Sequence, residues 1–224
     1  MIKNLLKDKK KLTLIIGGLL ILIVIIVVLN LLFKDGGLVV EVKNPDGEKF
    51  ENEYEQLNGE LGEEGKILPE VNISSNNVIK YSVVDDIINI FSNDGDGVVY
   101  FGSANCAYCR NVVQILYDTA VNTKLDTIYY VDLSKEDDYT KLFEYMGEKF
   151  LVDNKEIYSP LVIFITNGDI SSYNKGTLFS QGDPYVEMDD SQKAGLSEIY
   201  GYGIRDVVNS INSKNSAKKN EVNG

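Results

Sequence analysis

The sequence predicts an α/β domain built on a mixed β-sheet and preceded by a single membrane-spanning helix. Over residues 78–212, short apolar segments alternate with segments whose apolar residues recur at helical spacing, in the order β-α-β-α-β-α-β-β-α. Strands separated by helices indicate parallel pairing, and the closing hairpin adds an antiparallel pair. The apolar run at residues 13–33 is long enough to cross a bilayer, which takes about 20 helical residues.

The apolar run at residues 13–33 is expected to be a retained anchor. A cleaved signal peptide is the alternative. The apolar core of a signal peptide usually has about 7–15 residues and is followed by a small-residue cleavage pattern, whereas this run is longer and no such pattern follows it. Lysines are concentrated before the run, and only Lys34 lies just after it. Cytoplasmic flanks of membrane helices are rich in lysine and arginine. We therefore expect residues 1–12 to be a cytoplasmic tail and the remaining chain to be extracytoplasmic, at the cell membrane.

Residues 34–77 are polar and rich in Gly, Glu and Asn, and they are predicted to form an extracytoplasmic stalk. The domain is then expected to occupy residues 78–212, followed by a flexible tail at residues 213–224. Ser82 is the expected N-cap of its first helix. Predicted strands lie at residues 79–81, 98–101, 127–133, 161–165 and 170–173, and predicted helices lie after Ser82, after Cys106, over Tyr139–Met146 and from about Ser191.

Two glycine-containing segments shape the end of the predicted domain. Asn167-Gly168 predicts a tight hairpin turn between the last two strands. Gly195, Gly201 and Gly203 weaken the last helix and predict that it bends.

Charge and composition exclude several classes of function. The formal net charge is −12, and because lysines are concentrated at the N-terminus, the rest of the chain is more acidic still. An acidic surface repels phosphate backbones, so nucleic acid is not an expected partner. The chain has no histidine, which removes Cys-His and Ser-His-Asp catalysis as well as histidine metal ligands.

The two cysteines of the chain, Cys106 and Cys109, stand at the predicted start of a helix. A thiol attacks a disulfide only as the thiolate, and a free-thiol pKa of about 8.5 leaves little thiolate at neutral pH. At a helix start, unpaired backbone N–H groups and the positive end of the helix dipole stabilise charge on the first sulfur. The second sulfur lies one turn further on, within reach of the first. Arg110 adds positive charge nearby unless it points into solvent. This setting predicts thiol–disulfide exchange.

The CxxC sequence has two other interpretations. It could be half of a zinc site, but the chain has no second CxxC and no histidine to complete four ligands. It could be an inert structural disulfide, but such a small loop would contribute little stability. We therefore expect no metal ion and no cofactor apart from a redox-active Cys106–Cys109 disulfide.

Two segments resemble the signatures of the thioredoxin family. Residues 98–110 (VVYFGSANCAYCR) look like its active-site segment, and residues 159–169 (SPLVIFITNGD) look like its second signature, where a cis-proline opens the strand facing the CxxC. The resemblance covers residues 78–211 and implies a thioredoxin-like fold. With the anchor, the acidic stalk and Gly176-Thr177, the pattern is similar to membrane-anchored thioredoxin-like proteins of Gram-positive bacteria, some of which are labelled bacteriocin transport accessory proteins.

The resemblance implies roles for individual residues. Cys106 would be the exposed nucleophile and Cys109 the resolving thiol. Pro160 would be the cis-proline, and the backbone of Ser159 would pair with a bound substrate chain as an extra strand. Ala107 and Tyr108, between the cysteines, are the other expected substrate contacts. The implied partners are cysteine-containing exported proteins and a separate electron donor or acceptor, membrane-bound or not.

The sequence departs from the thioredoxin pattern at three places. Asn105 replaces the tryptophan before the first cysteine, Tyr100 stands where thioredoxins carry a buried acid, and Ala107-Tyr108 lies between the cysteines. These changes leave the direction of the reaction open, and an intermediate potential nearer the reducing side is expected. The alternative function is a non-enzymatic accessory protein that binds a transporter or a secreted peptide.

Overall fold

The computed structural model describes residues 44–135, 139–152, 156–178 and 181–222. The predicted cytoplasmic tail and the predicted anchor at residues 13–33 lie outside these ranges. Within the described ranges, no helix is both long enough and apolar enough to cross a membrane.

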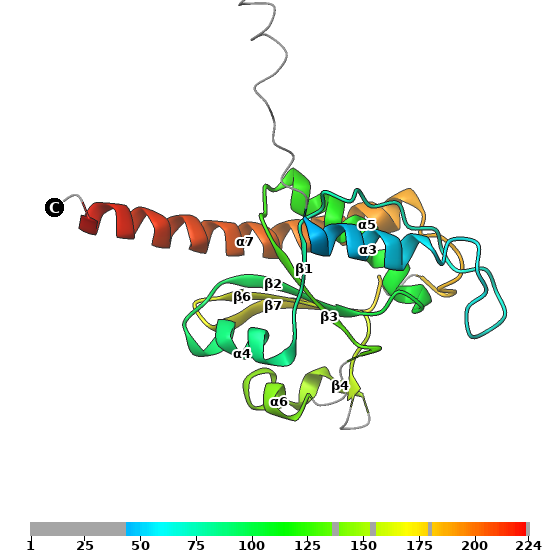
Figure 1. Ribbon diagram of the computed structural model, residues 1–224, viewed down its shortest axis with the longest axis horizontal. Helices are drawn as coiled ribbons and strands as arrows, with labels where there is room; N and C mark the ends of the chain where they lie inside the picture. Colours follow the sequence, from blue (N-terminus) through cyan, green and yellow to red (C-terminus); the bar gives the residue numbers. More distant parts are fainter. Residues whose placement is uncertain (1–43, 136–138, 153–155, 179–180, 223–224) are drawn as a thin grey trace, which may run out of the picture. The chain divides into compact units, whose positions relative to one another are not determined.

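A five-stranded mixed sheet forms the centre of the domain, with the strand order β1-β3-β2-β6-β7 (Figure 1). The strands β1, β3 and β2 pair in parallel, whereas β6 is antiparallel to β2 and β7 is antiparallel to β6. The predicted mixed α/β sheet is therefore confirmed. The strands are β1 (Ile79–Tyr81), β2 (Gly97–Gly102), β3 (Ile128–Asp132), β6 (Leu161–Thr166) and β7 (Asp169–Lys175).

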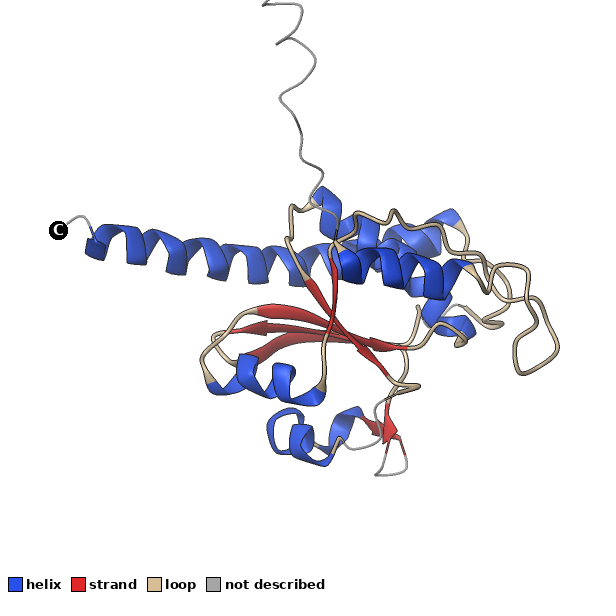
Figure 2. Ribbon diagram, viewed as in Figure 1, coloured by secondary structure: helices blue, strands red, loops and turns tan. Residues whose placement is uncertain are grey.

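Helices cover both faces of this sheet (Figure 2). One layer contains α3 (Pro45–Glu55), α5 (Ala107–Asn122) and α7 (Asp190–Val222). The other contains α4 (Val84–Ser92) and α6 (Thr140–Met146), followed by the short helix η1 (Glu148–Phe150). Each layer has its own apolar core, because alternate residues of the buried strands face opposite sides of the sheet. In β2, Tyr100 faces the α5 layer and Phe101 faces the α4 layer.

A second, two-stranded sheet of β4 (Leu151–Val152) and β5 (Glu156–Ile157) was not predicted. The cap predicted for α4 also differs. The residue before the helix is Val83, not Ser82, and its backbone N–H donates to the Asp86 carboxylate at 3.1 Å.

The predicted stalk is wrong for residues 44–77, which belong to the folded domain. Phe50 and Tyr54 of α3 are completely buried, and Val71 and Ile73 of the following segment are 1% exposed. These side chains lie in the same core as α5 and β2. Burying these side chains removes apolar area from water and stabilises the fold by roughly 25 cal/mol per Å². An extended stalk would not gain this stabilisation. The domain boundary therefore lies near residue 44 and not at residue 78.

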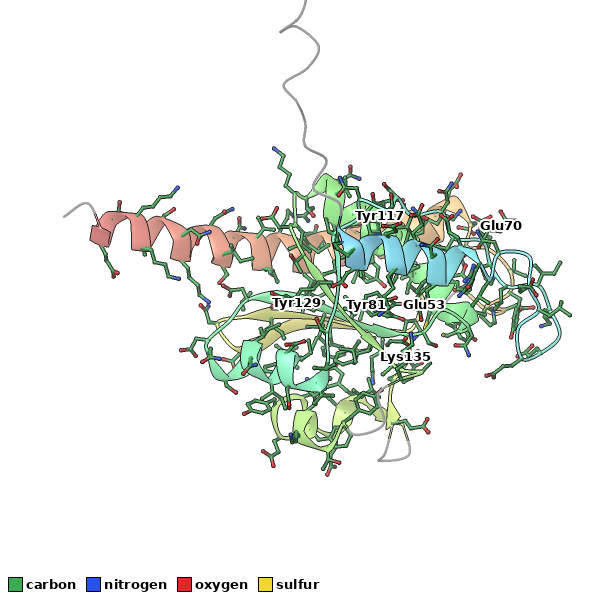
Figure 3. All side chains as sticks on the ribbon, in the orientation of Figure 1. Glu53, Glu70, Tyr81, Tyr117, Tyr129 and Lys135 are labelled. Carbon is green, nitrogen blue, oxygen red and sulfur yellow. The ribbon has the colours of Figure 1, made fainter. Side chains whose placement is uncertain are left out.

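Polar contacts fasten α3 to the edge of the sheet (Figure 3). Tyr81 of β1 donates a hydrogen bond to Glu53 of α3, and Lys135 lies 2.8 Å from the same carboxylate. Lys135 also forms an ion pair with Asp132 at the end of β3. This cluster joins α3 to two neighbouring strands.

The last helix also differs from the prediction, because α7 continues without interruption to Val222 through the predicted flexible tail. Extending an existing helix adds one hydrogen bond per residue without a new nucleation step. Lys214 fixes this part of the helix by an ion pair with Asp96 at 2.7 Å. Gly203 serves packing, since a Cβ there would lie 2.5 Å from the ring of Phe164.

Candidate active site

The two cysteines occupy the first turn of α5, as predicted. Cys106 is the N-cap residue, and its sulfur accepts a hydrogen bond from the backbone N–H of Cys109 at 3.1 Å. Both cysteines are free thiols in the structure; Cys106 is partly exposed and Cys109 is completely buried. The first turn of α5 carries no acidic residue, so nothing on the helix itself offsets its positive end. Cys106 can therefore be reached from solvent, whereas Cys109 cannot.

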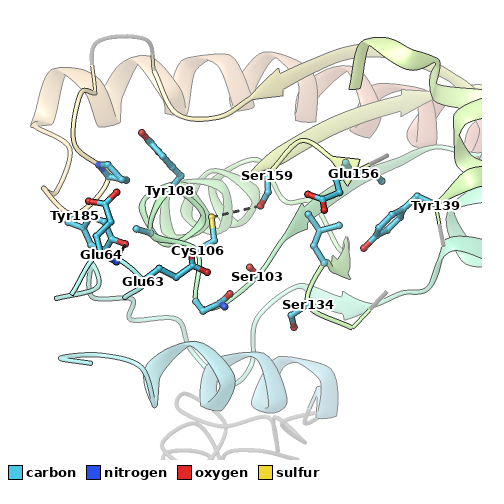
Figure 4. Close-up of a pocket in the computed structure, with 15 residues that line it drawn as sticks. Glu63, Glu64, Ser103, Cys106, Tyr108, Ser134, Tyr139, Glu156, Ser159 and Tyr185 are labelled. Carbon is cyan, nitrogen blue, oxygen red and sulfur yellow. Dashed lines mark hydrogen bonds between the residues drawn. The ribbon is translucent and has the colours of Figure 1, made fainter. Parts of the chain in front are cut away.

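The second signature faces the cysteines. The Ser159–Pro160 peptide bond is cis, as the resemblance implied. The Ser159 hydroxyl lies 3.1 Å from the sulfur of Cys109 and donates to the sulfur of Cys106 at 3.8 Å (Figure 4). The loop before β6 thus places one hydroxyl within reach of both sulfurs. A polar side chain at position 159, and not only its backbone, belongs to the site.

The two thiols are electrostatically different. A hydrogen bond from Cys109 is the main cause that lowers the pKa of Cys106 to about 7, against the opposing effect of burial. Backbone N–H groups of the helix start and the Ser159 hydroxyl lower it further. Burial raises the pKa of Cys109 well above its usual value, and the neighbouring Cys106 raises it again. Near neutral pH, Cys106 is therefore the thiol that ionises, and Cys109 keeps its proton.

A groove of about 600 Å³ opens beside Cys106 (Figure 4). Three of the four predicted substrate contacts line it: Ser159, Ala107 and Tyr108. Tyr108 is 38% exposed, whereas Ala107 is mostly buried. Pro160 is buried and does not line the groove. Asn105 also lines it, at the position where thioredoxins have tryptophan.

Sequence reasoning missed several residues that line the groove. Glu63 and Glu64 come from the segment predicted to be a stalk, Glu156 comes from β5, and Tyr185 comes from the loop before α7. These residues lie on loops or on a two-residue strand, where periodicity carries no signal. Acidic side chains thus border the groove at separate points around Cys106 (Figure 4).

The hydroxyl of Tyr100, at the position of the thioredoxin acid, lies in an aromatic cluster under α5. It donates to the carbonyl of Cys109 at 3.5 Å and lies 3.1 Å from the hydroxyl of Tyr54. Its ring stacks on Tyr130 with centroids 5.4 Å apart. Burial raises the pKa of both Tyr54 and Tyr100 well above the usual value. Both hydroxyls therefore stay neutral, and neither replaces a carboxylate as a base.

Arg110 does not point into solvent, because its side chain is only 1% exposed. The guanidinium donates to three backbone carbonyls and to the side-chain oxygen of Asn58. Two of these carbonyls belong to Tyr54 and Pro69, and the third belongs to Ala104 in the turn before the cysteines, at 3.0 Å. Arg110 thus ties the N-terminal segment to the active-site turn. The residue sequence alone gave no signal for this, because the partners lie far away along the chain.

No protein-family model matches the sequence, and no curated protein matches it. Among solved structures, the chain is similar to thioredoxin O2 from Arabidopsis thaliana, with 15% identity, coverage of 55% of this chain and 96% of that one, and a TM-score of 0.36. It is also similar to thioredoxin from Trypanosoma brucei brucei, with 17% identity, coverage of 59% and 91%, and a TM-score of 0.37.

The architecture described above is thioredoxin-like. Its mixed sheet is flanked by helices, the CxxC begins the helix after β2, and the cis-proline precedes β6. The two cysteines lie close together, which is compatible with thiol–disulfide exchange.

Proposed function

We propose that this protein is a thiol–disulfide oxidoreductase that uses Cys106 and Cys109 on cysteines of exported proteins. The observation that carries the proposal is the pairing of a partly exposed Cys106, whose pKa is lowered to about 7, with a buried Cys109 in the same helical turn. The thiolate is the form that attacks disulfides. A module that only binds a partner needs neither a lowered thiol pKa nor a second sulfur within reach.

In the reducing direction, the Cys106 thiolate attacks a substrate disulfide. A bond forms between Cys106 and one substrate sulfur, and the other substrate sulfur leaves as a thiolate and takes a proton. Cys109 then attacks Cys106, which releases the second substrate sulfur as a thiol. The substrate gains two electrons and the protein is left with a Cys106–Cys109 disulfide. A separate electron donor must then reduce this disulfide.

The loop at Ser159 is proposed to hold the substrate chain. Among the described residues, the backbone N–H and C=O of Ser159 form no backbone hydrogen bond, although Pro160 accepts one from Gly176 at 2.8 Å. Free backbone groups at the end of a strand pair readily with an extended peptide. Tyr108 on the opposite wall offers an exposed aromatic ring. A substrate strand at Ser159 would bring its disulfide next to Cys106.

The predicted anchor places this chemistry outside the cytoplasm, at the cell membrane, in a protein of the Gram-positive thioredoxin-like type. The lysines before residues 13–33 and the apolar character of that run support this part of the proposal.

Trapping of client proteins tests the proposed function. In cells that express Cys109→Ser, the mixed disulfide on Cys106 cannot be resolved, so disulfide-linked complexes should accumulate on non-reducing gels. Cys106→Ser is the matched control and should trap nothing. If both variants trap alike, or neither traps, the enzyme proposal fails and the accessory-protein alternative is favoured.

A further inference from the structure

We infer that the side-chain hydroxyl of Ser159 is a catalytic proton relay between Cys109 and the sulfur that leaves Cys106. This inference rests on the proposed function and goes beyond the backbone role that the resemblance gives to Ser159. It follows from the position of one hydroxyl within reach of both sulfurs (Figure 4).

The direction of proton transfer follows from the state of Cys106. In the reduced protein, the single proton of the Cys109 thiol lies in the hydrogen bond to Cys106. Once Cys106 is bonded to substrate it is no longer a thiolate, and the Cys109 thiol can donate to the Ser159 oxygen at the 3.1 Å contact, where either group can be the donor. A hydroxyl has one proton to donate and two lone pairs that accept, so Ser159 keeps its own proton for the Cys106 side, 3.8 Å away. In the mixed disulfide, the order is thus Cys109 thiol, Ser159 hydroxyl, Cys106 sulfur.

The buried Cys109 thiol needs such a relay. Cys109 must lose its proton to attack, but it is completely buried and its pKa is raised. Within the described ranges, no carboxylate forms a hydrogen bond with its sulfur, and the position of the thioredoxin acid holds Tyr100. The nearby acidic groove residues line the Cys106 side.

The other titratable or charged groups around Cys109 are poor proton acceptors. Tyr100 of β2, Tyr54 of α3 and Tyr200 of α7 are all buried hydroxyls with raised pKa values, so they are neutral. Arg110 of α5 is a cation whose bonds go to four oxygens elsewhere. Among the described hydrogen bonds, the Cys109 sulfur contacts two side chains, those of Cys106 and Ser159.

The relay conserves protons and electrons. In the mixed disulfide, Cys109 attacks Cys106, and the bond from Cys106 to the substrate sulfur breaks. The Cys109 proton passes to the Ser159 oxygen, and the Ser159 hydroxyl proton passes to the departing substrate sulfur. The products are the Cys106–Cys109 disulfide and a substrate thiol, and Ser159 ends as a hydroxyl.

The test compares Ser159→Thr with Ser159→Val in the full chain in detergent. Threonine keeps the hydroxyl, whereas valine has nearly the same shape without it, so the pair separates chemistry from packing. Each protein is mixed in single turnover with hydroxyethyl disulfide, whose alkyl thiolate is a strong base. Acid quenching and mass spectrometry then follow how fast the mixed disulfide disappears.

We expect Ser159→Val to slow this resolution at least tenfold, because proton transfer by a positioned group typically contributes about 10²–10⁴-fold. Ser159→Thr should recover most of the rate. With an aryl disulfide, whose leaving thiolate needs no proton, the loss in Ser159→Val should be smaller. A purely structural effect would slow both substrates equally.

The outcomes separate the relay from the proposed function. If wild type forms the mixed disulfide and resolves it, but Ser159→Val does so at the same rate, the relay is overturned and the exchange function stands. Equal slowing with both leaving groups, or no recovery in Ser159→Thr, also overturns the relay. If wild type forms no mixed disulfide at all, the proposed function itself fails.

Discussion

The pH dependence of Cys106 reactivity is the most direct measure of the site. A pKa of about 7 makes roughly half of Cys106 thiolate at neutral pH. A free cysteine with a pKa of about 8.5 is only about 3% thiolate there, so the gain in thiolate is about 15-fold. A thiolate of lower pKa is also intrinsically less nucleophilic, by about fivefold for this difference. The net rate gain at neutral pH is therefore only about threefold.

The inflection of the pH profile, rather than the absolute rate, thus identifies the perturbed thiol. We expect the alkylation rate of Cys106 by iodoacetamide to rise with pH and to level off above its pKa of about 7. The chain has only two cysteines and Cys109 is completely buried, so mass spectrometry can assign the first alkylation to Cys106. An inflection at the free-thiol value of about 8.5 would refute the electrostatic reasoning.

Variants at Cys109 identify the cause of the shift. The hydrogen bond from the Cys109 side chain is the largest of the causes that lower the pKa of Cys106. Cys109→Ala removes this donor and should move the inflection to higher pH. Cys109→Ser keeps a donor and should move it less. If both variants keep the wild-type inflection, the backbone N–H groups alone account for the shift.

Two further predictions concern stability, measured by chemical denaturation. Arg110→Met leaves the buried carbonyls of Pro69 and Ala104 without the donor they have here, at about 1–3 kcal/mol each, whereas the Tyr54 carbonyl keeps the N–H of Leu57; the free energy of unfolding should fall by at least about 2 kcal/mol. The exposed Arg205 gives the control, and Arg205→Met should change the free energy of unfolding by less than about 0.5 kcal/mol. Similar losses in the two variants would contradict the buried role of Arg110. Gly203→Ala should cost about 1–3 kcal/mol, because its Cβ would meet the Phe164 ring at 2.5 Å. On the same helix, Gly201→Ala meets only the flexible end of Arg205 and should be neutral or stabilising; the reverse order would refute the packing argument.

Local signals were sufficient for the centre of the domain. The apolar strand β2, the helix start at Cys106 and the Asn167-Gly168 turn each follow from neighbouring residues, and the structure confirms them. The cis bond at Pro160 came from the resemblance. These features depend on contacts between residues close in sequence or on paired signatures.

Long-range contacts account for the failures. The buried residues of the 44–77 segment, such as Phe50 and Val71, are separated by polar stretches and show no sustained period. Their burial depends on α5, which comes much later in the chain. The burial of Arg110 could not be predicted for the same reason. A charged residue is usually exposed, and three of the four hydrogen-bond acceptors of Arg110 lie 41 to 56 positions away along the chain. Only the folded chain brings these oxygens to one point.

The same sulfur environment supports the reducing direction. A thiolate stabilised in the reduced protein makes a thioredoxin-like dithiol more oxidising, and the family range from about −270 to about −120 mV corresponds to roughly 7 kcal/mol. Lowering the pKa of Cys106 from about 8.5 to about 7 represents only about 2 kcal/mol of stabilisation. Strong oxidants reach thiol pKa values near 3.5, whereas reductants stay near 7. We therefore expect a potential on the reducing side of that range. Equilibration with glutathione measures it directly, and a value near −120 mV would make the protein an oxidase.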